Sequence, residues 1–493
     1  MQLEDLAAAA LERPGDSRAI FYKGAWFSWS WMRRVASSVQ AHLTKFGVSA
    51  DARVGIVARN NPTFVASFLS LIARQRTIVM VHPLQSPSAM AGEVANLELD
   101  ALLADDSFWV GELIDASMQR GALGIALEAA SGLSRVVAQP SAKRPVRSAN
   151  GPVSIELLTS GTTGRPKRFP MSFEMIGRAM INESSMRSSQ ADAPPALIMF
   201  PFGNISGVYS YLPTLLTGQP IVLLDKFTVA EWLDFVKTYR PSIISLPTAG
   251  VRMVLDAGVR PEELQSIRFV SSGASSLDPK LQEEFTQRYK VPILLSYGAT
   301  EFGGVITAMT PDDYQQYGPS KLTSVGRPWA NVSIRIVDAD TNCELGPNET
   351  GILEILAARC GPDWIRTTDL GAIDGDGFLY HRGRSDGAIM RGGFKILPDL
   401  VAEKIAMHPS VAAVAVVGLA DPRLGEIPVA AVEQRSGFPR LTEEELRAHA
   451  AKHLQRTHIP VYFRVVDELP RTQSMKVHLP AVKALFNETP SAK

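Results

Sequence analysis

The sequence has few of the features that mark several large classes of protein. Its 493 residues include only two cysteines, Cys343 and Cys360, which excludes a disulfide framework and a structural zinc site and favours a reducing compartment. Fifty basic residues balance fifty acidic ones, so no net charge favours nucleic acid or an anionic membrane as a partner. The eight histidines are scattered along the chain, and we expect no histidine metal site. What remains is an ordinary globular protein.

Long apolar runs are also missing. The most apolar stretch, residues 64–81, is interrupted by Arg74, Gln75 and Arg76, and it predicts a buried helix followed by a strand. The N-terminus carries acidic residues where a signal peptide would carry Lys or Arg, and it predicts an amphipathic helix that ends before Pro14. We therefore expect a cytoplasmic protein without integral membrane contact.

The pattern that is present is a long alternation of strand and helix signals, which predicts an α/β protein of at least two domains. Residues 1–150 and 197–305 alternate apolar strands with helices, as parallel sheets with crossover helices do. Residues 325–379 change to short β runs with Gly/Asp turns, which predicts a small antiparallel sheet or barrel. Beyond residues 383–386, a capped helix at 399–407 and further strands predict a small α+β domain.

A stretch rich in Gly, Ser and Thr follows an apolar run at residues 153–158. It reads T-S-G-T-T-G-R-P-K from Thr159 to Lys167. Gly161 and Gly164 let backbone N–H groups approach a ligand, while the hydroxyls and Lys167 add donors for phosphate. The spacing differs from Walker A, because two residues separate the glycines and no Ser or Thr follows the lysine. A polar surface loop is the alternative.

Other positions carry side chains suited to nucleotide chemistry. At a predicted strand end in Y-G-A-T-E, Tyr297 is suited to stack on a base, Thr300 to meet a phosphate and Glu301 to hold Mg²⁺. Asp369 follows a β-like segment and is suited to accept both hydroxyls of a ribose. Lys476 is suited to act as a mobile cation. A turn or a solvated surface residue is the alternative for each.

Each of two glycine-rich segments has two possible interpretations. Residues 383–396 read G-R-S-D-G-A-I-M-R-G-G-F-K-I, which suits a hinge or a close approach of backbone to a ligand, with an ordinary hairpin as the alternative. Residues 374–377 read D-G-D-G. A hairpin turn is favoured there over a calcium loop, because the spacing of an EF-hand is missing.

The order and spacing of the motifs closely resemble the adenylate-forming superfamily of acyl- and aryl-CoA synthetases, nonribosomal peptide adenylation domains and firefly luciferase. After the glycine-rich loop come P-F-G-N-I-S-G, S-S-G-A-S-S-L, Y-G-A-T-E, R-T-T-D-L-G, G-R-S-D and P-R-T-x-x-x-K, so the resemblance runs from about residue 54 to residue 476. It implies a large N-terminal domain, residues 1–383, of parallel α/β sheets plus a small β-barrel-like part. It also implies a small mobile C-terminal α+β domain, residues 384–493.

The resemblance implies a role for each matching position. Residues 159–167 embrace the β- and γ-phosphates of ATP, Asp386 is the hinge, and Lys476 bridges the substrate carboxylate and the α-phosphate. The implied catalytic residues are Lys476, Thr300, Glu301, which also ligates Mg²⁺, and Lys167. The implied ATP contacts are Thr159, Ser160, Gly161, Thr162, Thr163, Gly164, Lys167, Ser272, Gly273, Ala274, Ser275, Tyr297, Gly298, Ala299, Thr300, Asp369 and Arg384. The acyl pocket is assigned to Phe202, Asn204, Val208, Phe302, Gly303 and Gly304, and the coenzyme A tunnel to Arg391, Gly392 and Gly393.

The implied activity is ligation of a carboxylic acid to coenzyme A, with ATP and Mg²⁺, through an acyl-AMP. No acidic residue lies between residues 200 and 211 to pair with a substrate ammonium, which disfavours a free amino acid. The apolar residues of the pocket and its glycine pair favour a hydrophobic acid that is bulky, aromatic or of medium chain length. The alternatives are an enzyme that loads an acyl carrier protein in trans and a nucleotide-binding paralogue without catalysis.

Four positions depart from the commoner pattern of that superfamily. Asn204 stands where many relatives have His or an aromatic residue, and Thr368 and Met475 stand where Gly is usual. Arg168 adds a charge directly after the glycine-rich loop, and the sequence gives no reason for it. We expect Met475 to stiffen the segment that carries Lys476.

Overall fold

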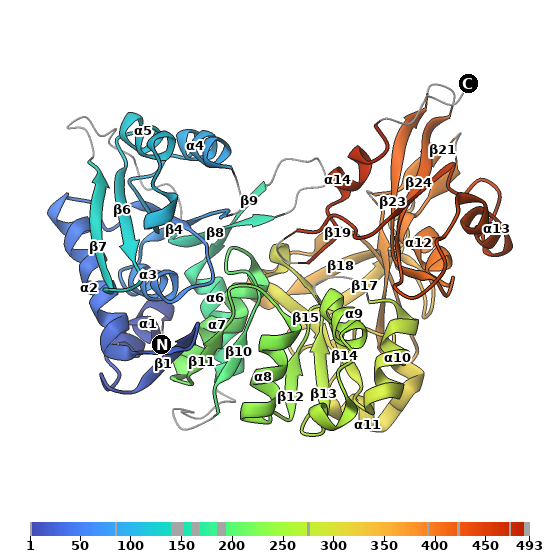
Figure 1. The fold of residues 1–493 in the computed structure, drawn as a ribbon, viewed down its shortest axis with the longest axis horizontal. Coiled ribbons are helices and arrows are strands. Elements are labelled where there is room, and N and C mark those ends of the chain that lie inside the picture. Colours follow the sequence, from blue (N-terminus) through green and yellow to red (C-terminus); the bar gives the residue numbers. More distant parts are fainter. Residues whose placement is uncertain are drawn as a thin grey trace. The chain divides into compact units, whose positions relative to one another are not determined.

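The computed structural model describes residues 2–83, 86–139, 152–159, 167–184, 194–273, 277–385, 387–391, 394–421, 424–472 and 475–487 (Figure 1). The chain divides into two compact units. Unit 1 comprises residues 1–161, 165–241 and 299–304, and unit 2 comprises residues 162–164, 242–298 and 305–493. Both units combine sheets with helices, which confirms the α/β class.

The larger sheet of unit 1 has seven strands in the order β7-β6-β5-β3-β4-β8-β9. The pairs from β6 to β8 are parallel, whereas β7 and β9 run antiparallel to their neighbours at the two edges. The predicted parallel sheet is therefore confirmed, and the sequence missed β6 and β9. The strands are β3 (Arg53–Val57), β4 (Thr77–Val81), β5 (Ala101–Asp105), β6 (Leu123–Glu128), β7 (Leu133–Ala138), β8 (Ser154–Thr159) and β9 (Lys167–Ser172).

The most apolar stretch of the sequence forms helix α3 (Pro62–Ala73). Asn61 Oδ1 accepts a hydrogen bond from the backbone N–H of Phe64 at 2.8 Å, and Pro62 occupies the first turn, so the start of the helix is fixed locally. The helix is buried on all sides from Pro62 to Ile72, as expected for a core helix. Among the helices of the described ranges, none is long and apolar enough to cross a membrane.

A second sheet of unit 1 joins the N-terminus to a segment some 180 residues later. Its order is β10-β11-β1-β2, with β1 parallel to β11 and antiparallel to β2. Helix α7 (Ile205–Thr217) connects β10 to β11, and helices α1 (Leu3–Leu11) and α2 (Trp29–Lys45) flank the N-terminal hairpin in sequence. The strands are β1 (Arg18–Tyr22), β2 (Ala25–Ser28), β10 (Ala196–Ile198) and β11 (Ile221–Leu223).

Unit 2 begins with a five-stranded sheet in the order β12-β13-β14-β15-β16, whose first three strands are parallel. The predicted helix α10 (Pro279–Tyr289) lies between β13 and β14, and Asp278 Oδ1 accepts from Lys280 N at 2.9 Å, which confirms the predicted cap. The strands are β12 (Ile243–Ser245), β13 (Phe269–Ser272), β14 (Ile293–Ala299), β15 (Gly304–Ala308) and β16 (Arg327–Pro328).

The predicted small antiparallel sheet is present as β17 (Val332–Val337), β18 (Gly351–Ala357), β19 (Ile365–Ile373) and β20 (Leu379–Arg384), paired in that order. The D-G-D-G segment is the turn between β19 and β20, as favoured above. Lys321 Nζ donates to Asp374 Oδ2 at 2.6 Å and to Asp376 Oδ2 at 2.7 Å, so a lysine contacts these carboxylates. Asp369 lies within β19 rather than after it, which corrects the sequence assignment.

The residues beyond 384 form a sheet in the order β22-β21-β24-β23, with β25 parallel to β24. The capping box of Thr442 and Glu445 at helix α13 (Glu443–His453) is confirmed. Helix α12 (Pro398–Ala406) begins one residue before Asp399 and has no side-chain cap, so the predicted capped start was wrong. The strands are β21 (Ile389–Arg391), β22 (Phe394–Ile396), β23 (Val411–Asp421), β24 (Gly425–Gln434) and β25 (Tyr462–Val466). The division at residues 383–384 stays a prediction.

Three histidines pack against one another around α13. The ring centroids of His408 and His449 are 5.1 Å apart, and those of His449 and His453 are 4.8 Å apart. Burial lowers the pKa of His449 below its ordinary value of 6.5. The hydrogen bond with the carbonyl of Lys404 opposes this shift, and the neighbouring histidines and Lys452 add to it. The fold therefore favours the neutral imidazole.

This cluster predicts a loss of stability in mild acid. A group whose pKa is lower in the folded than in the unfolded state contributes stability above the unfolded pKa, near 6.5, and loses it as the pH falls through the folded value. We expect the thermal midpoint to fall between about pH 7.5 and pH 5.5 by less in His449→Gln than in wild type, because the amide can donate to the Lys404 carbonyl without titrating. His42→Gln in unit 1 is the control. Parallel curves for wild type and His449→Gln would contradict the prediction.

Candidate functional site

Unit 2 gathers three of the residues that the sequence assigned to ATP. Tyr297 lies on β14, Asp369 on β19 and Arg384 on β20, where Asp369 and Arg384 are paired across the two strands. Tyr297 Oη donates to Asp369 Oδ2 at 2.5 Å, and Arg384 Nε lies 3.9 Å from Asp369 Oδ1. A carboxylate with an aromatic ring and a guanidinium beside it is a suitable surface for a nucleoside.

The environment keeps Asp369 ionised. Its side chain is only 14% exposed, and burial by itself raises the pKa of the carboxyl. Contacts with His381 and Tyr297, together with the charge of Arg384, outweigh burial and hold this pKa below its ordinary value of 3.8. At neutral pH the group therefore only accepts hydrogen bonds, as a partner for ribose hydroxyls must.

Thr368, one of the departures from the superfamily pattern, fixes the guanidinium of Arg384. Arg384 Nη2 donates to Thr368 Oγ1 at 2.5 Å. The Thr368 carbonyl accepts from the N–H of Ser385 at 2.7 Å and from its hydroxyl at 2.9 Å. Residue 368 thus ties the end of β20 to β19 beside Asp369. Glycine in its place would keep the carbonyl contacts with Ser385 but lose the hydroxyl that binds Arg384.

The segment assigned to adenine ends strand β13 at Ser272. An ideal Cβ built on Gly273 would lie 2.5 Å from Ser296 Oγ, so a glycine is needed where this backbone passes β14. Ser296 Oγ donates to the carbonyl of Ser272 at 3.3 Å. Ala274 and Ser275 lie outside the described residues, and Gly298 and Ala299 complete β14.

The glycine-rich stretch of unit 1 connects two paired strands. Thr159 closes β8 opposite Lys167, the first residue of antiparallel strand β9. The residues between them, Ser160, Gly161, Thr162, Thr163 and Gly164 among them, lie outside the described ranges. β9 was missed because Pro170 argues against a strand, yet an edge strand tolerates proline.

Arg168 has a structural explanation. Its Nη1 donates to the carbonyl of Met80 on β4 at 2.8 Å, and its Nη2 pairs with Glu93 on helix α4 (Pro87–Asn96). Its side chain is 18% exposed. The charge that the sequence left unexplained therefore anchors β9 to the sheet.

Thr300 and Glu301 lie in a short 3₁₀ turn, Thr300–Phe302, which follows β14 along the chain. Thr300 is buried and Glu301 is exposed. Within the ranges that the structure describes, no group of three or more His, Cys, Asp or Glu is arranged to hold a metal ion. A single exposed carboxylate suits Mg²⁺, which is commonly held by one or two carboxylates together with substrate phosphates and water.

The residues assigned to the acyl pocket differ in their surroundings. Phe202 and Val208 are fully buried in the core of unit 1, and the ring of Phe202 lies 5.1 Å from that of Phe64. Asn204 caps α7, because its Oδ1 accepts from the N–H of Gly207 at 2.9 Å. This hydrogen bond explains why asparagine suits position 204, where many relatives carry other residues.

The rest of the assigned acyl pocket follows Glu301. Phe302 is 1% exposed, and Gly303 and Gly304 have φ angles of 71° and 107°. An ideal Cβ on Gly304 would lie 3.5 Å from the ring of Tyr209, which is ordinary contact, so the backbone angle rather than space calls for glycine here.

Tyr211 is a buried polar residue that the sequence analysis missed. Its ring centroid lies 4.2 Å from that of Phe202, and its hydroxyl has no hydrogen-bond partner among the residues that the structure describes. Full burial raises the pKa of this phenol well above 10. A polar atom within an aromatic cluster is a candidate contact for a polar group of a ligand.

Lys476 lies at an exposed turn in unit 2. The N–H of Thr472 donates to the Lys476 carbonyl at 2.7 Å, and the N–H of Met475 donates to the Thr472 carbonyl at 2.9 Å. Met475 has a φ of 61°, the left-handed region where a residue with a side chain costs about 1–2 kcal/mol relative to right-handed backbone. Glycine, usual at this position in the superfamily, would not be strained.

The assigned tunnel and hinge are only partly described. Arg391 ends β21, pairs with Phe394 of β22, and donates through Nη1 to the carbonyl of Thr457 at 2.5 Å. This part of the segment therefore forms an antiparallel strand pair, and its role in a hinge or a tunnel stays a prediction. Gly392, Gly393 and the hinge residue Asp386 lie outside the described ranges.

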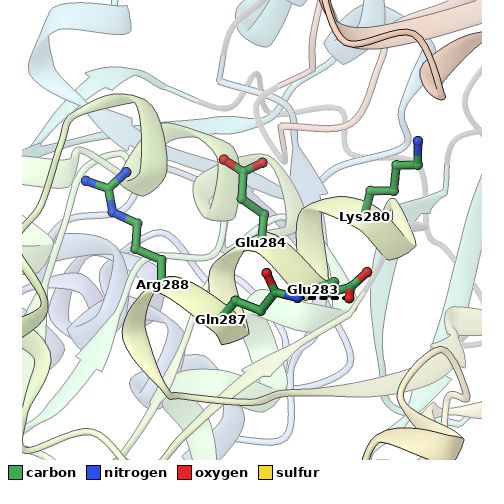
Figure 2. A pocket seen from close by; sticks show the side chains of 5 residues that line it. All are labelled: Lys280, Glu283, Glu284, Gln287 and Arg288. Atoms are coloured by element: carbon green, nitrogen blue, oxygen red, sulfur yellow. Dashed lines mark hydrogen bonds between the residues drawn. The ribbon is translucent and has the colours of Figure 1, made fainter.

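A charged groove lies on α10 and contains none of the assigned residues (Figure 2). Glu284 in this groove lies 3.6 Å from Arg252 Nη1 and 3.9 Å from Arg435 Nη2. The groove, with a volume of about 620 Å³, is lined by Lys280, Glu283, Glu284, Gln287 and Arg288. Its lining is entirely charged or amide, which does not suit a hydrophobic acid.

His381, beside Asp369 in unit 2, is a second residue that the sequence analysis missed. It lies on β20 opposite Gly371, and its Nε2 is 3.6 Å from Asp369 Oδ1. A signal was available, because counting back from the D-G-D-G turn in an antiparallel hairpin brings His381 close to Asp369. The strand assignment that placed Asp369 after a β segment hid this register.

Comparison with known proteins identifies the family to which this chain belongs. A family model described as "AMP-binding enzyme" matches residues 6–358, and one described as "AMP-binding enzyme C-terminal domain" matches residues 401–476. A 2-succinylbenzoate–CoA ligase of Bacillus velezensis is 31% identical over 65% of this chain and 66% of its own length. The Mycobacterium tuberculosis medium/long-chain-fatty-acid–CoA ligase FadD8 is 27% identical over 92% of this chain and 85% of its own length. The chain thus spans just under two thirds of the first relative.

Solved structures match over nearly the whole chain. ATP-bound MatB from Rhodopseudomonas palustris has a TM-score of 0.81, with 20% identity and 99% of each chain covered. The o-succinylbenzoate CoA synthetase of Bacillus subtilis, in complex with an acyl-adenylate, has a TM-score of 0.75, with 23% identity over 100% of this chain and 99% of the other. Because both identities are below 25%, the likeness concerns the fold alone, and it confirms the expected fold.

The unpartnered hydroxyl of Tyr211 predicts that its removal does not destabilise the protein. An unsatisfied buried polar group costs about 1–3 kcal/mol, so we expect Tyr211→Phe to keep or raise the thermal midpoint. Tyr289→Phe is the matched control, because the Tyr289 hydroxyl donates to the Val259 carbonyl at 3.0 Å, and its loss should cost about 1 kcal/mol. Equal destabilisation of the two variants would show that the Tyr211 hydroxyl has a partner.

Proposed function

This chain belongs to the AMP-binding enzyme family, and we propose that it is an ATP-dependent carboxylic acid:coenzyme A ligase of the AMP-forming type. It first joins the acid to ATP, releasing pyrophosphate and forming acyl-AMP. A thiol then attacks the mixed anhydride and AMP leaves. The observation that carries the proposal is the ionised carboxylate of Asp369, with Tyr297 and Arg384 placed around it in unit 2.

The chemistry of adenylation requires charge neutralisation rather than proton transfer. A carboxylate is a poor acyl donor because its leaving group would be oxide, and as a nucleophile toward phosphorus it is already anionic and needs no general base. Mg²⁺, when bound at Glu301, offsets the negative charge of the phosphates. Lys476 supplies positive charge to the carboxylate and α-phosphate, and Lys167 with the glycine-rich residues 159–167 receives the departing pyrophosphate.

The nucleoside is held by the groups of unit 2. The hydroxyls of the ribose donate to Asp369, Arg384 supports that carboxylate, and the ring of Tyr297 lies against the adenine, with Ser272 and Gly273 along its edge. Thr300 donates to the α-phosphate. Because Lys476 belongs to the C-terminal domain, residues 384–493, a rotation at Asp386 removes it and brings the segment of Arg391 to the same site for thioester formation.

The acid is hydrophobic. Phe202, Val208 and Phe302 provide a buried apolar surface, and the hydroxyl of Tyr211 beside Phe202 offers one polar contact. Relatives named for 2-succinylbenzoate, fatty acids and indoleacetate support an aromatic or medium-chain acid. A panel of such acids, read out by pyrophosphate release and then by consumption of coenzyme A, tests the proposal. Release of pyrophosphate without a thioester would favour a carrier protein as the acceptor, and no acyl-AMP from any acid would favour a non-catalytic paralogue.

The assignment of Lys476 predicts that its loss separates the two half-reactions. We expect Lys476→Ala to slow acid-dependent ATP–pyrophosphate exchange by about 10²–10³-fold, the usual effect of removing one group that stabilises transition-state charge. Thioester formation from supplied acyl-AMP should change by less than about threefold, because the lysine has left the site in that step. The exposed Lys483→Ala on helix α14 (Leu479–Ala484) is the control. Unchanged exchange in Lys476→Ala would show that another residue has this role.

A further inference from the structure

His381 contacts two of the residues that hold the nucleoside. Its Nε2 lies 3.6 Å from Asp369 Oδ1, and its ring centroid lies 5.4 Å from that of Tyr297, with the planes 34° apart. Its side chain is 21% exposed, so it is largely enclosed by these neighbours. None of the roles described above uses this imidazole.

Each oxygen of the Asp369 carboxylate is contacted by a different side chain. Tyr297 Oη donates to Oδ2 at 2.5 Å, whereas His381 Nε2 faces Oδ1 at a distance within ion-pair range but beyond a direct hydrogen bond. Two contacts on opposite oxygens restrict rotation of the carboxylate plane. Since an ionised carboxylate has about four acceptor positions, both contacts leave positions for two further donors.

A further carboxylate lies near His381. Asp399, in the first turn of α12, interacts electrostatically with both His381 and Arg384. Its Oδ2 lies 2.7 Å from the position of an ideal Cβ on Gly383, which has a φ of 94°. A glycine at residue 383 therefore allows this close approach. The imidazole is consequently held between Asp369, Tyr297 and the start of α12.

We propose that His381 is a positioning residue for the nucleotide, which orients the Asp369 carboxylate so that it accepts both the 2′- and the 3′-hydroxyl of the ribose. The inference rests on the proposed function, because it assigns Asp369 to the ribose of ATP. A carboxylate fixed in advance loses less freedom when the nucleotide binds, and both hydroxyls then contribute to affinity.

The test compares ATP with 2′-deoxy-ATP and 3′-deoxy-ATP in the pyrophosphate exchange reaction. We expect wild type to prefer ATP over each deoxynucleotide by about tenfold or more, since hydrogen bonds to charged groups are worth more than neutral ones. In His381→Phe, which keeps an aromatic ring against Tyr297 but has no N–H, this preference should fall at least about threefold. The KM for ATP should rise while the KM for the acid stays unchanged.

His381→Gln provides the rescue, because its amide retains an N–H donor and should restore most of the preference. His458→Gln, in the turn between α13 and β25, is the control and should behave as wild type. Binding of AMP and 2′-deoxy-AMP by calorimetry gives the same comparison without catalysis. Full discrimination in His381→Phe, or equal loss in His381→Phe and His381→Gln, overturns the inference while the proposed function stands. Wild-type protein that binds neither ATP nor AMP overturns the proposed function and the inference together.

Discussion

The ionised carboxylate of Asp369 is the group on which the cluster of Tyr297, His381 and Arg384 in unit 2 depends. A largely buried charge is costly unless other groups compensate it, and here a phenol, an imidazole and a guanidinium do so. Each of these groups sits on a strand whose position is fixed by other contacts. The pairing of β19 with β20 places Arg384 opposite Asp369, and the turn between these strands is bound by Lys321. The pairing of β19 with β20 therefore determines how the groups around Asp369 are arranged.

Sequence predicted the part of the site in which chemistry is local. A hydroxyl, a carboxylate and a ring at strand ends indicated a nucleoside surface, and Tyr297, Asp369 and Arg384 do meet in space. It did not predict the position of Asp369 within β19 or the nearness of His381, because both follow from the register of the β19–β20 pair, which was not worked out from the turn between them. Helices with local caps, such as α3 and α10, were predicted at their starts, because a cap is encoded within four residues.

Residues that depart from a superfamily pattern were hard to interpret from sequence, since their partners are distant in the chain. Arg168 anchors β9 through Met80 and Glu93, which come 75 or more residues earlier. Thr368 binds Arg384 across the hairpin. Asn204 is the exception, because it caps α7 through the N–H of Gly207, a local contact. Burial of Phe202 in the core of unit 1 likewise shows that an apolar residue near a motif serves packing whether or not it also touches substrate. Local patterns identify reactive groups, and long-range pairing explains their neighbours.

The left-handed backbone of Met475 has a consequence for the conformational entropy of the segment that carries Lys476. A residue with a side chain has fewer backbone states in the unfolded or undocked segment than glycine has. Met475 therefore limits the backbone arrangements open to the residues beside it, Lys476 included. In the proposed mechanism, which returns Lys476 to one position at every turnover, less disorder then has to be removed each time. The backbone strain at Met475 and the smaller number of backbone states both result from one residue, a methionine where glycine is usual in the superfamily.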